Sequence, residues 1–424
     1  MVILIAGGSG FLGNRIARGL LAAGHEVISA QRHAHTDTPG NTLRTVAADF
    51  NRDTVSDWLP RLVGVDAVIN AVGILRERGN QRFASLHVAG PKALFAACAK
   101  GGVRRVVQIS ALGADDQASS GYHLSKKAAD DFLLALPLAA TVVQPSLVFG
   151  PGGMSARLFT ALASLPLIPL PGRGEQEIQP IHVDDLVQAI VTLVSMEDGF
   201  EGERIALVGP ETLSLRRFLE DLRRSLGWGR PRFLRLPMPL VRIAASLAEH
   251  LPGSLLDREA LAMLERGNTG SPASTATLLG KPPRPASRFV AANERQGARA
   301  LGRLFWCLPL LRWSVAAVWI VTGIVSLGLF PVAESYALLS RAGITGQAAI
   351  LALYGAAALD LAFGIGILLF RRRRALWLAQ IALVFTYTGI ISVYLPEFWL
   401  HPYGPILKNL PLLGVLWLLY LFAE

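Results

Sequence analysis

The chain has 424 residues, of which 52% are hydrophobic and 17% charged, with a formal net charge of +10 at pH 7. Its two cysteines, Cys98 and Cys307, exclude a disulfide framework and favour a reducing compartment. No basic-aromatic module is visible, so we expect no nucleic-acid partner, and an anionic membrane surface explains the positive charge better. The length allows two or three domains.

The chain opens with an apolar, β-branched run at 2–6, which predicts a buried parallel strand. A glycine-rich turn leads from it into a helix predicted over 14–24. Gly7, Gly10 and Gly13 have GxxGxxG spacing, which provides a tight turn, close approach of a diphosphate and close packing of helix on strand. Between a strand and a helix this spacing predicts a dinucleotide site, with helix N–H groups facing the phosphates.

A second strand is predicted at 26–30 and is followed by Gln31, Arg32 and His33. An NAD site of this kind usually has an acidic residue at this strand end, where it binds the adenosine ribose. Arg32 occupies that place instead and can pair with a 2′-phosphate. The sequence therefore favours NADP(H), with NAD(H) as the alternative.

Further strands are predicted at 43–48, 67–73, 105–110 and 140–145, separated by helices, notably over 91–100 and 125–136. Regular alternation of strand and helix requires a doubly wound parallel sheet, a Rossmann-type α/β fold. Such sheets bind ligands at the carboxyl ends of their strands. The cofactor-binding residues expected from the glycine turn, the strand ends and one helical lysine are Gly7, Gly10, Phe11, Leu12, Gly13, Arg32, Asp49, Ala71, Val72, Gly73, Lys126 and Pro145.

After the sixth strand, the Gly- and Pro-rich stretch 150–174, with a helix near 156–164, is expected to close over the cofactor. A helix then runs to about Ser195, with Asp184 as its expected N-cap.

Helices at 213–226 and 240–251 predict a small substrate lobe. This lobe completes a first domain over 1–268. The Ser, Pro and Gly content of 269–285 predicts a linker, which continues as a basic juxtamembrane segment to 304.

Three residues carry the chemistry that we expect. Ser110 ends the fifth strand, and Tyr122 and Lys126 lie one turn apart on one face of the following helix. A nearby ammonium lowers the pKa of a tyrosine, which makes Tyr122 an acid/base, while Lys126 can also hold the nicotinamide ribose. The Ser110 hydroxyl would orient a carbonyl or alcohol. No cluster of residues suggests a metal site.

The region 305–424 predicts an all-α membrane domain, because a bilayer core needs about 20 apolar residues per helix. Its four expected spans are approximately 313–330, 347–370, 375–395 and 404–423. The last is the weakest, since Lys408 and two prolines interrupt its start.

Basic residues near the spans set the expected orientation. They gather before the first span and at Arg371–Arg374, whereas 331–346 contains only Arg341 and 396–403 contains none. The N-terminus has an apolar core of only about five residues, too short for a signal peptide. We therefore expect a multi-pass protein of the cell (inner) membrane, with the nucleotide-binding domain and both termini on the cytoplasmic side.

Asp360 lies near the middle of the second predicted span, where an ionisable side chain is costly. Two interpretations are open. It could contact a quinone headgroup or a proton path, or it could be an interior carboxyl bonded to Tyr387 or another helix.

The glycine turn, Ser110, Tyr122, Lys126 and the run 144–152 (QPSLVFGPG) together resemble an extended or atypical short-chain dehydrogenase/reductase. The run 87–91 (HVAGP) is similar to the branch that contains the nucleotide-binding accessory subunit of respiratory complex I, although many relatives have asparagine at His87.

This first resemblance covers about residues 1–290. The tail, through the runs 331–336 (PVAESY) and 404–411 (GPILKNLP), resembles the DoxX-like membrane family, some of whose wider group are associated with quinones.

These observations predict a membrane-anchored, NAD(P)(H)-dependent oxidoreductase that acts on a small, lipophilic or quinone-like substrate. One alternative is a non-catalytic nucleotide-binding subunit or assembly protein of a membrane complex. A second is an NAD-dependent epimerase or dehydratase. The sequence leaves open whether the protein belongs to a membrane complex or forms a homo-oligomer.

Overall fold

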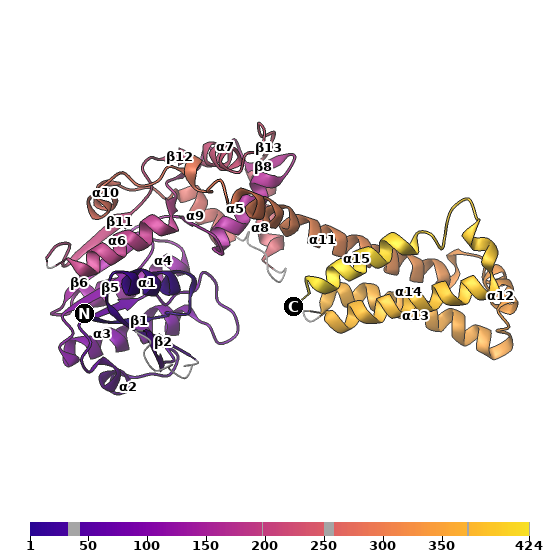
Figure 1. Cartoon of the computed structure of the whole chain (residues 1–424), viewed down its shortest axis with the longest axis horizontal. Helices are drawn as coiled ribbons and strands as arrows, with labels where there is room; N and C mark the ends of the chain where they lie inside the picture. Colours follow the sequence, from indigo (N-terminus) through magenta and orange to yellow (C-terminus); the bar gives the residue numbers. More distant parts are fainter. Residues whose placement is uncertain (33–42, 197, 250–257, 371–372, 424) are drawn as a thin grey trace. The chain divides into compact units, whose positions relative to one another are not determined.

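The computed structural model describes residues 1–32, 43–196, 198–249, 258–370 and 373–423 (Figure 1). The chain divides into two compact units, Met1–Gly302 and Arg303–Glu424. The strands of the first unit are β1 (Val2–Ala6), β2 (Glu26–Gln31), β3 (Leu43–Ala47), β4 (Ala67–Asn70), β5 (Arg105–Ile109), β6 (Ala139–Pro145), β7 (Val148–Phe149), β8 (Ile168–Pro171), β9 (Glu177–Ile178), β10 (Ile181–His182), β11 (Glu203–Leu207), β12 (Leu213–Ser214) and β13 (Phe233–Leu236). Its helices are α1 (Phe11–Ala22), α2 (Val55–Trp58), η1 (Leu59–Leu62), η2 (Ala84–Ala89), α3 (Gly90–Gly101), α4 (Gly121–Leu134), α5 (Met154–Ser164), α6 (Val183–Ser195), α7 (Leu215–Ser225), α8 (Met238–Ala248), α9 (Arg258–Arg266), α10 (Ala273–Leu279) and η3 (Ala286–Arg288).

A seven-stranded parallel sheet in the order β11-β6-β5-β4-β1-β2-β3 organises the first unit, which confirms the predicted Rossmann-type fold. After β3 the chain crosses to the other side of β1 and forms β4. The switch in strand order therefore lies between β1 and β4, where such sheets bind ligands.

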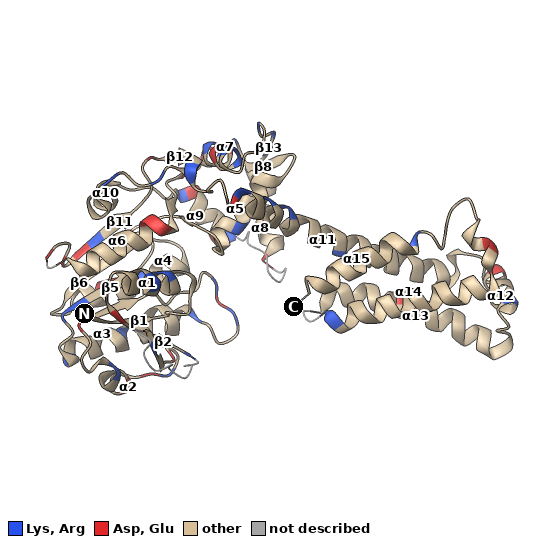
Figure 2. Cartoon of the chain, viewed as in Figure 1, with Lys and Arg blue, Asp and Glu red and all other residues tan. Residues whose placement is uncertain are grey.

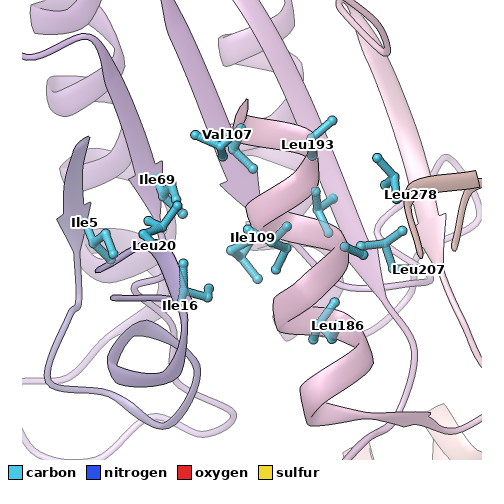
Figure 3. Close-up of a cluster of buried hydrophobic side chains, with 14 of the residues drawn as sticks. Ile5, Ile16, Leu20, Ile69, Val107, Ile109, Leu186, Leu193, Leu207 and Leu278 are labelled. Atoms are coloured by element: carbon cyan, nitrogen blue, oxygen red, sulfur yellow. The ribbon is translucent and has the colours of Figure 1, made fainter. Parts of the chain in front are cut away.

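Helices cover both faces of the sheet, because successive side chains of each strand point to opposite sides. On β1, Ile3 and Ile5 pack with α1 and α6, whereas Leu4 and Ala6 pack into a second core with α3 and α4. Figure 3 shows the first of these cores, with side chains from the central strands meeting those of α1 and α6. Burial on both faces explains why the strands read as continuous apolar runs.

The predicted strands are all present, with ends that differ by up to three residues. The sequence analysis missed β11, which extends the sheet beyond β6. It also assigned the wrong cap to α6. His182 is the N-cap, and its Nδ1 accepts a hydrogen bond from the Asp184 backbone N–H at 3.2 Å.

A smaller lobe packs around a third core, to which α5, α7, β8 and η3 contribute. The predicted linker 269–285 lies within the first compact unit and contains α10. Thr275 of this helix is buried and its hydroxyl accepts a hydrogen bond from the Val208 N–H at 2.9 Å. Of the predicted positions, His33, Leu251, Arg371 and Arg372 lie outside the described residues.

The second unit is helical. Its elements, the first of which begins in the preceding unit, are α11 (Arg295–Ile324), η4 (Val325–Leu329), α12 (Val332–Arg341), α13 (Gly346–Leu369), α14 (Arg374–Tyr394), η5 (Pro396–Trp399) and α15 (Asn409–Leu421). Trp319, Phe363, Trp377 and Leu416 come from four of these helices and share one core. Figure 2 shows how few charged residues lie along α13, α14 and α15.

Among the described residues, three helices are long and apolar enough to cross a membrane, namely Arg295–Leu329, Gly346–Leu369 and Arg374–Tyr394. They correspond to the first three predicted spans. The fourth predicted span forms α15, which has only 13 residues and is shorter than a bilayer core requires. The three apolar helices indicate a membrane protein.

Candidate active site

The glycine turn joins β1 to α1 with close backbone contacts. Gly7 has a φ of +81°, which favours glycine. A Cβ on Gly13 would lie 2.1 Å from the Gly7 carbonyl oxygen, so only glycine fits there. Gly10 is the N-cap of α1 and has no side chain to accept from the first N–H groups of the helix. This turn can therefore bind a diphosphate through the N–H groups of Phe11, Leu12 and Gly13.

The turn also contacts the loop that follows β4. A Cβ on Gly7 would lie 3.1 Å from the backbone of Ala71 and Val72. Gly73 likewise allows a close approach to α4, since a Cβ there would lie 3.1 Å from Nζ of Lys126. The sequence-predicted residues after β1 and β4 thus lie side by side.

Lys126 is the centre of the polar site. Its side chain is only 4% exposed, and Nζ donates to the Val72 carbonyl at 3.1 Å and to the Ile109 carbonyl at 3.0 Å. Burial lowers the pKa of Lys126 from its ordinary 10.5 to about 8, and the negative charge of Asp130 partly opposes this shift. The ammonium form of Lys126 therefore predominates at neutral pH, which is only about one unit below this pKa.

Asp130 is a site residue that the sequence analysis missed. It lies one helical turn after Lys126, is fully buried, and its Oδ2 accepts the hydrogen bond of the Ser110 hydroxyl. Burial raises the pKa of Asp130 to about 6, although the Ser110 hydroxyl and the charge of Lys126 lower it. The i, i+4 spacing of an acid after Lys126 is a signal that could have revealed this residue.

The hydrogen bond to Asp130 changes what Ser110 can do. Because Ser110 donates its only hydroxyl proton to Asp130, its oxygen is left to accept, as from an alcohol or a phenol. Orientation of a carbonyl by Ser110, as the sequence predicts, requires that this hydroxyl turn away from Asp130 or that Asp130 be protonated.

Tyr122 lies on the first turn of α4, on the same helix face as Lys126. Within the described residues its hydroxyl forms no hydrogen bond. Burial, together with the charge of Asp130, raises the pKa of Tyr122 to about 12. The direction is opposite to the lowering expected from Lys126, so in this structure Tyr122 is a phenol that keeps its proton at neutral pH.

His87 links the two sides of the site. Its Nε2 accepts from the Ile74 N–H at 2.9 Å, so the proton resides on Nδ1, which donates to the Ser125 Oγ at 2.8 Å. Ser125 in turn donates to the Tyr122 carbonyl at 2.7 Å. Burial and the charge of Lys126 lower the pKa of His87 to about 3, so the ring remains neutral. It orients the start of α4 against the loop after β4.

The remaining predicted cofactor residues occupy different environments. Arg32 is exposed directly after β2. Asp49 follows β3 and stabilises a local turn, where its Oδ1 accepts from the Asn51 N–H at 3.0 Å. Pro145 is buried at the end of β6, and its carbonyl accepts from the Leu112 N–H at 3.0 Å.

The loop after β7 lies against the N-terminal end of α1, as expected for a segment that closes over the cofactor. Arg15 donates to the Pro151 carbonyl at 2.5 Å, and a Cβ on Gly153 would lie 2.8 Å from the Phe11 ring. The loop after β7 therefore packs against one side of the glycine turn.

Two family models match the chain in succession. Residues 3–209 match the NAD dependent epimerase/dehydratase family, and residues 316–417 match the DoxX-like family. These matches confirm the two resemblances that the sequence suggested. A nicotinamide cofactor follows from the first of them together with the glycine turn described above.

Two relatives match more than half of this chain. Subunit 9 of the NADH dehydrogenase [ubiquinone] 1 alpha subcomplex, a mitochondrial protein of Arabidopsis thaliana, is 28% identical over 258 residues, which are 58% of this chain and 63% of the plant protein. Ceramide reductase of Caulobacter vibrioides is 25% identical over 259 residues, 58% of this chain and 77% of the reductase.

Solved structures agree on the fold. UDP-glucuronic acid 4-epimerase from Bacillus cereus, in complex with UDP-glucuronic acid and NAD, matches with a TM-score of 0.51 and 16% identity and covers 72% of this chain and all of the epimerase. The chain thus combines a region that matches the NAD dependent epimerase/dehydratase family with a helical region that matches the DoxX-like family.

Proposed function

We propose that this protein is a membrane-anchored, NADP(H)-preferring oxidoreductase that reduces a carbonyl group of a lipophilic substrate. The observation that carries the proposal is the buried ammonium of Lys126, held by the backbone after β4 and β5, with Ser110 and Tyr122 beside it. The similarity to ceramide reductase, which is named for a lipid, supports the substrate class.

The roles of the chain's own residues follow from their protonation. When bound, the cofactor supplies a hydride to the carbonyl carbon. Tyr122 donates its phenolic proton to the carbonyl oxygen, and the positive charge of Lys126 stabilises the phenolate that remains. Ser110 donates to the same oxygen once its hydroxyl turns away from Asp130 or Asp130 is protonated. Lys126 would also hold a ribose hydroxyl of the cofactor.

A direct test uses the full-length protein in lipid nanodiscs. NADPH oxidation would be followed with a panel of long-chain ketones, quinones and aldehydes. We expect turnover with at least one of them, and a decrease of about 10²-fold or more for Tyr122→Phe. NADPH should raise the melting temperature of both proteins equally. Undiminished turnover in Tyr122→Phe would exclude the catalytic assignment.

The preference for NADP(H) rests on the exposed Arg32 at the end of β2, where no carboxylate stands. An arginine there pairs with a 2′-phosphate, whereas an acidic residue binds the 2′-hydroxyl. Arg32→Asp should therefore reverse the ratio of the dissociation constants for NADPH and NADH, measured by titration of cofactor fluorescence. An unchanged ratio would contradict the preference.

We further propose that the DoxX-like unit lies in the inner membrane with the first unit in the cytoplasm. The basic residues Arg295, Arg299 and Arg303 precede the first apolar stretch and support this orientation. If α15 crosses as a fourth span, the C-terminus is cytoplasmic as well. Activity of reporter enzymes fused to the C-terminus tests both statements.

A second candidate function is a nucleotide-binding subunit of a membrane complex that does not turn over. Its support is the similarity to the complex I subunit, together with the Ser110 hydroxyl committed to Asp130. In that case NADPH raises the melting temperature, no substrate of the panel is consumed, and the protein co-purifies with partner subunits under mild solubilisation.

A further inference from the structure

Helix α8 of the small lobe has an apolar face that is exposed. Leu240, Ile243 and Leu247 are 58%, 57% and 67% exposed, and their spacing places them on one side of the helix. The other side packs normally, since Val241 and Ala245 are buried against Leu261 of α9. An exposed row of large apolar side chains on a surface helix marks a contact with something outside the unit.

The stretch that leads into this helix is basic. Between Trp228 and Ala248 the sequence has four arginines and no acidic residue, although Glu249 follows and Arg242 pairs with Glu265 of α9 at 2.9 Å. Arg230, Arg232 and Arg235 are exposed beside the exposed Leu234, and Figure 2 shows basic residues concentrated around β13 and α7. A short apolar helix face flanked by arginines is the pattern of helices that lie in the interface of anionic membranes.

The covalent chain limits how far this segment can lie from the first candidate span. Arg299 of α11 donates from Nε to the Leu226 carbonyl at 2.6 Å, and its guanidinium lies 5.9 Å from the Trp228 ring. The apolar run that leads into the first candidate span starts at Leu304, five positions after Arg299. A chain of that length extends at most about 18 Å, which is the largest distance that the backbone allows between Arg299 and the start of this run.

We propose that α8 lies in the membrane interface, with Leu240, Ile243 and Leu247 among the upper acyl chains and Arg232 and Arg235 on anionic phosphate headgroups. The proposal rests on the membrane anchoring proposed above and is independent of turnover. It commits to a lipid surface as the occupant, because the exposed face combines apolar area with positive charge.

The contact leads toward the active site. Helix α8 packs on α9, and Glu259 of α9 accepts a hydrogen bond from the Tyr122 N–H at 3.0 Å. Two packed helices therefore connect the membrane contact to the helix that carries Tyr122 and Lys126. A lipophilic substrate would then reach the active site from the side of the small lobe that contacts the membrane.

The test measures the depth of a fluorophore in the full-length protein. In a Cys307→Ser background, an environment-sensitive dye is attached at Ile243→Cys, with Val63→Cys, an 82% exposed site, as the aqueous control. Val321→Cys, 58% exposed on α11, serves as the probe for membrane insertion. Cys98 is fully buried and should not react. Nanodiscs of phosphatidylcholine, with or without phosphatidylglycerol, contain lipids brominated near the headgroup or deep in the chain.

We expect shallow brominated lipids to reduce the emission at 243 by about half or more in anionic discs, with no loss at 63. Arg232→Glu combined with Arg235→Glu should weaken this quenching in anionic discs and leave it unchanged in neutral ones. If the probe at 321 is quenched by deep bromines and the probe at 243 by neither lipid, the α8 proposal is wrong while the anchoring stands.

Two outcomes at 243 then identify the actual environment. Free access of aqueous iodide means that α8 faces water. Protection from iodide without quenching by bromine means that a protein surface, such as a second copy, covers the helix. Loss of quenching at 321 as well would overturn the membrane anchoring itself.

Discussion

The two units hold their buried ionisable groups through different contacts. In the first, Lys126 and Asp130 are nearly inaccessible. Lys126 donates to the Val72 and Ile109 carbonyls, and Asp130 accepts from Ser110 through Oδ2, while its Oδ1 has no partner in the part of the chain that the structure describes. In the second, Asp360 is 5% exposed, and its Oδ1 has no hydrogen-bond partner among the described residues. Strand ends leave carbonyls free to accept from a side chain, whereas a helix uses its carbonyls internally. A buried charge is therefore easier to accommodate at a sheet edge than in a helical bundle.

The largest expected effect comes from removing the charge at the sheet edge. Lys126→Met should decrease turnover by about 10²-fold or more, since the group that stabilises the tyrosinate is lost. The melting temperature of the cofactor-free protein should change little, because the loss of two buried hydrogen bonds is offset by removal of an ammonium that burial already disfavours. The control is Lys127→Met. That lysine pairs with the exposed Asp131 at 2.7 Å, and its loss should have little effect on stability and none on turnover. Equal losses in both variants would contradict the role of Lys126.

Gly13→Ala tests whether the glycine turn tolerates a side chain at its closest backbone contact. The new Cβ would meet the Gly7 carbonyl at 2.1 Å, so the turn must shift, at a cost of about 1–3 kcal/mol and with weaker cofactor binding. Gly297→Ala is a matched control, because this helical glycine has open space around its Cβ position. It should gain about 0.5–1 kcal/mol. Thermal melts with and without NADPH measure both effects.

The pH dependence distinguishes function from stability at Lys126. Because its pKa in the fold is about 8, kcat/KM should decrease up to about tenfold per pH unit above that value. Stability should change in the opposite direction. The unfolded chain keeps this proton up to its ordinary pKa of 10.5, so the contribution of Lys126 to stability rises between pH 8 and 10.5.

Asp130→Asn tests whether Lys126 is the group that titrates in the pH profile of kcat/KM. The charge of Asp130 holds the pKa of Lys126 up, so its removal should move the decrease in kcat/KM to lower pH. The neighbouring Asp131→Asn, which alters an exposed carboxylate, should leave the profile in place. A profile that is identical in all three proteins would mean that another group titrates.

The smallest expected effect is in the helical unit. Asp360→Ala removes a carboxyl oxygen that has no partner, and stability in detergent should rise by about 1 kcal/mol. Gln380→Ala should do the reverse, because the Gln380 Oε1 accepts from the Trp319 Nε1 at 2.7 Å. If Asp360→Ala is destabilising, the carboxyl has a partner such as a bound proton donor, and a functional role in this unit gains support.

The fold was largely predictable because its signals are local. Strand periodicity, the glycine spacing and the Tyr122–Lys126 interval all lie within short windows of sequence. β11 was missed because the strand Glu203–Leu207 carries charged residues and follows a glycine turn. The predicted linker misled because α10 is rich in Ser and Thr, and its helix is stabilised by tertiary contacts such as that of Thr275 with Val208.

The chemistry of the site was less predictable, since it depends on burial. The spacing places Lys126 near Tyr122, but the direction of the Tyr122 pKa shift follows from desolvation and from Asp130, which is set by the packing of α4 on the sheet. The role of His182 as N-cap in place of Asp184 likewise required the backbone geometry at the start of α6.

The neutral imidazole of His87 restricts how a catalytic cycle can close. Both ring nitrogens are occupied by fixed neighbours, and with a pKa of about 3 the ring does not take up a second proton near neutrality. His87 therefore has a structural role and does not transfer protons. Once Tyr122 has given up its proton, the new proton has to come from water or from Lys126, and the turnover of this protein should be sensitive to whatever limits the access of water to Tyr122.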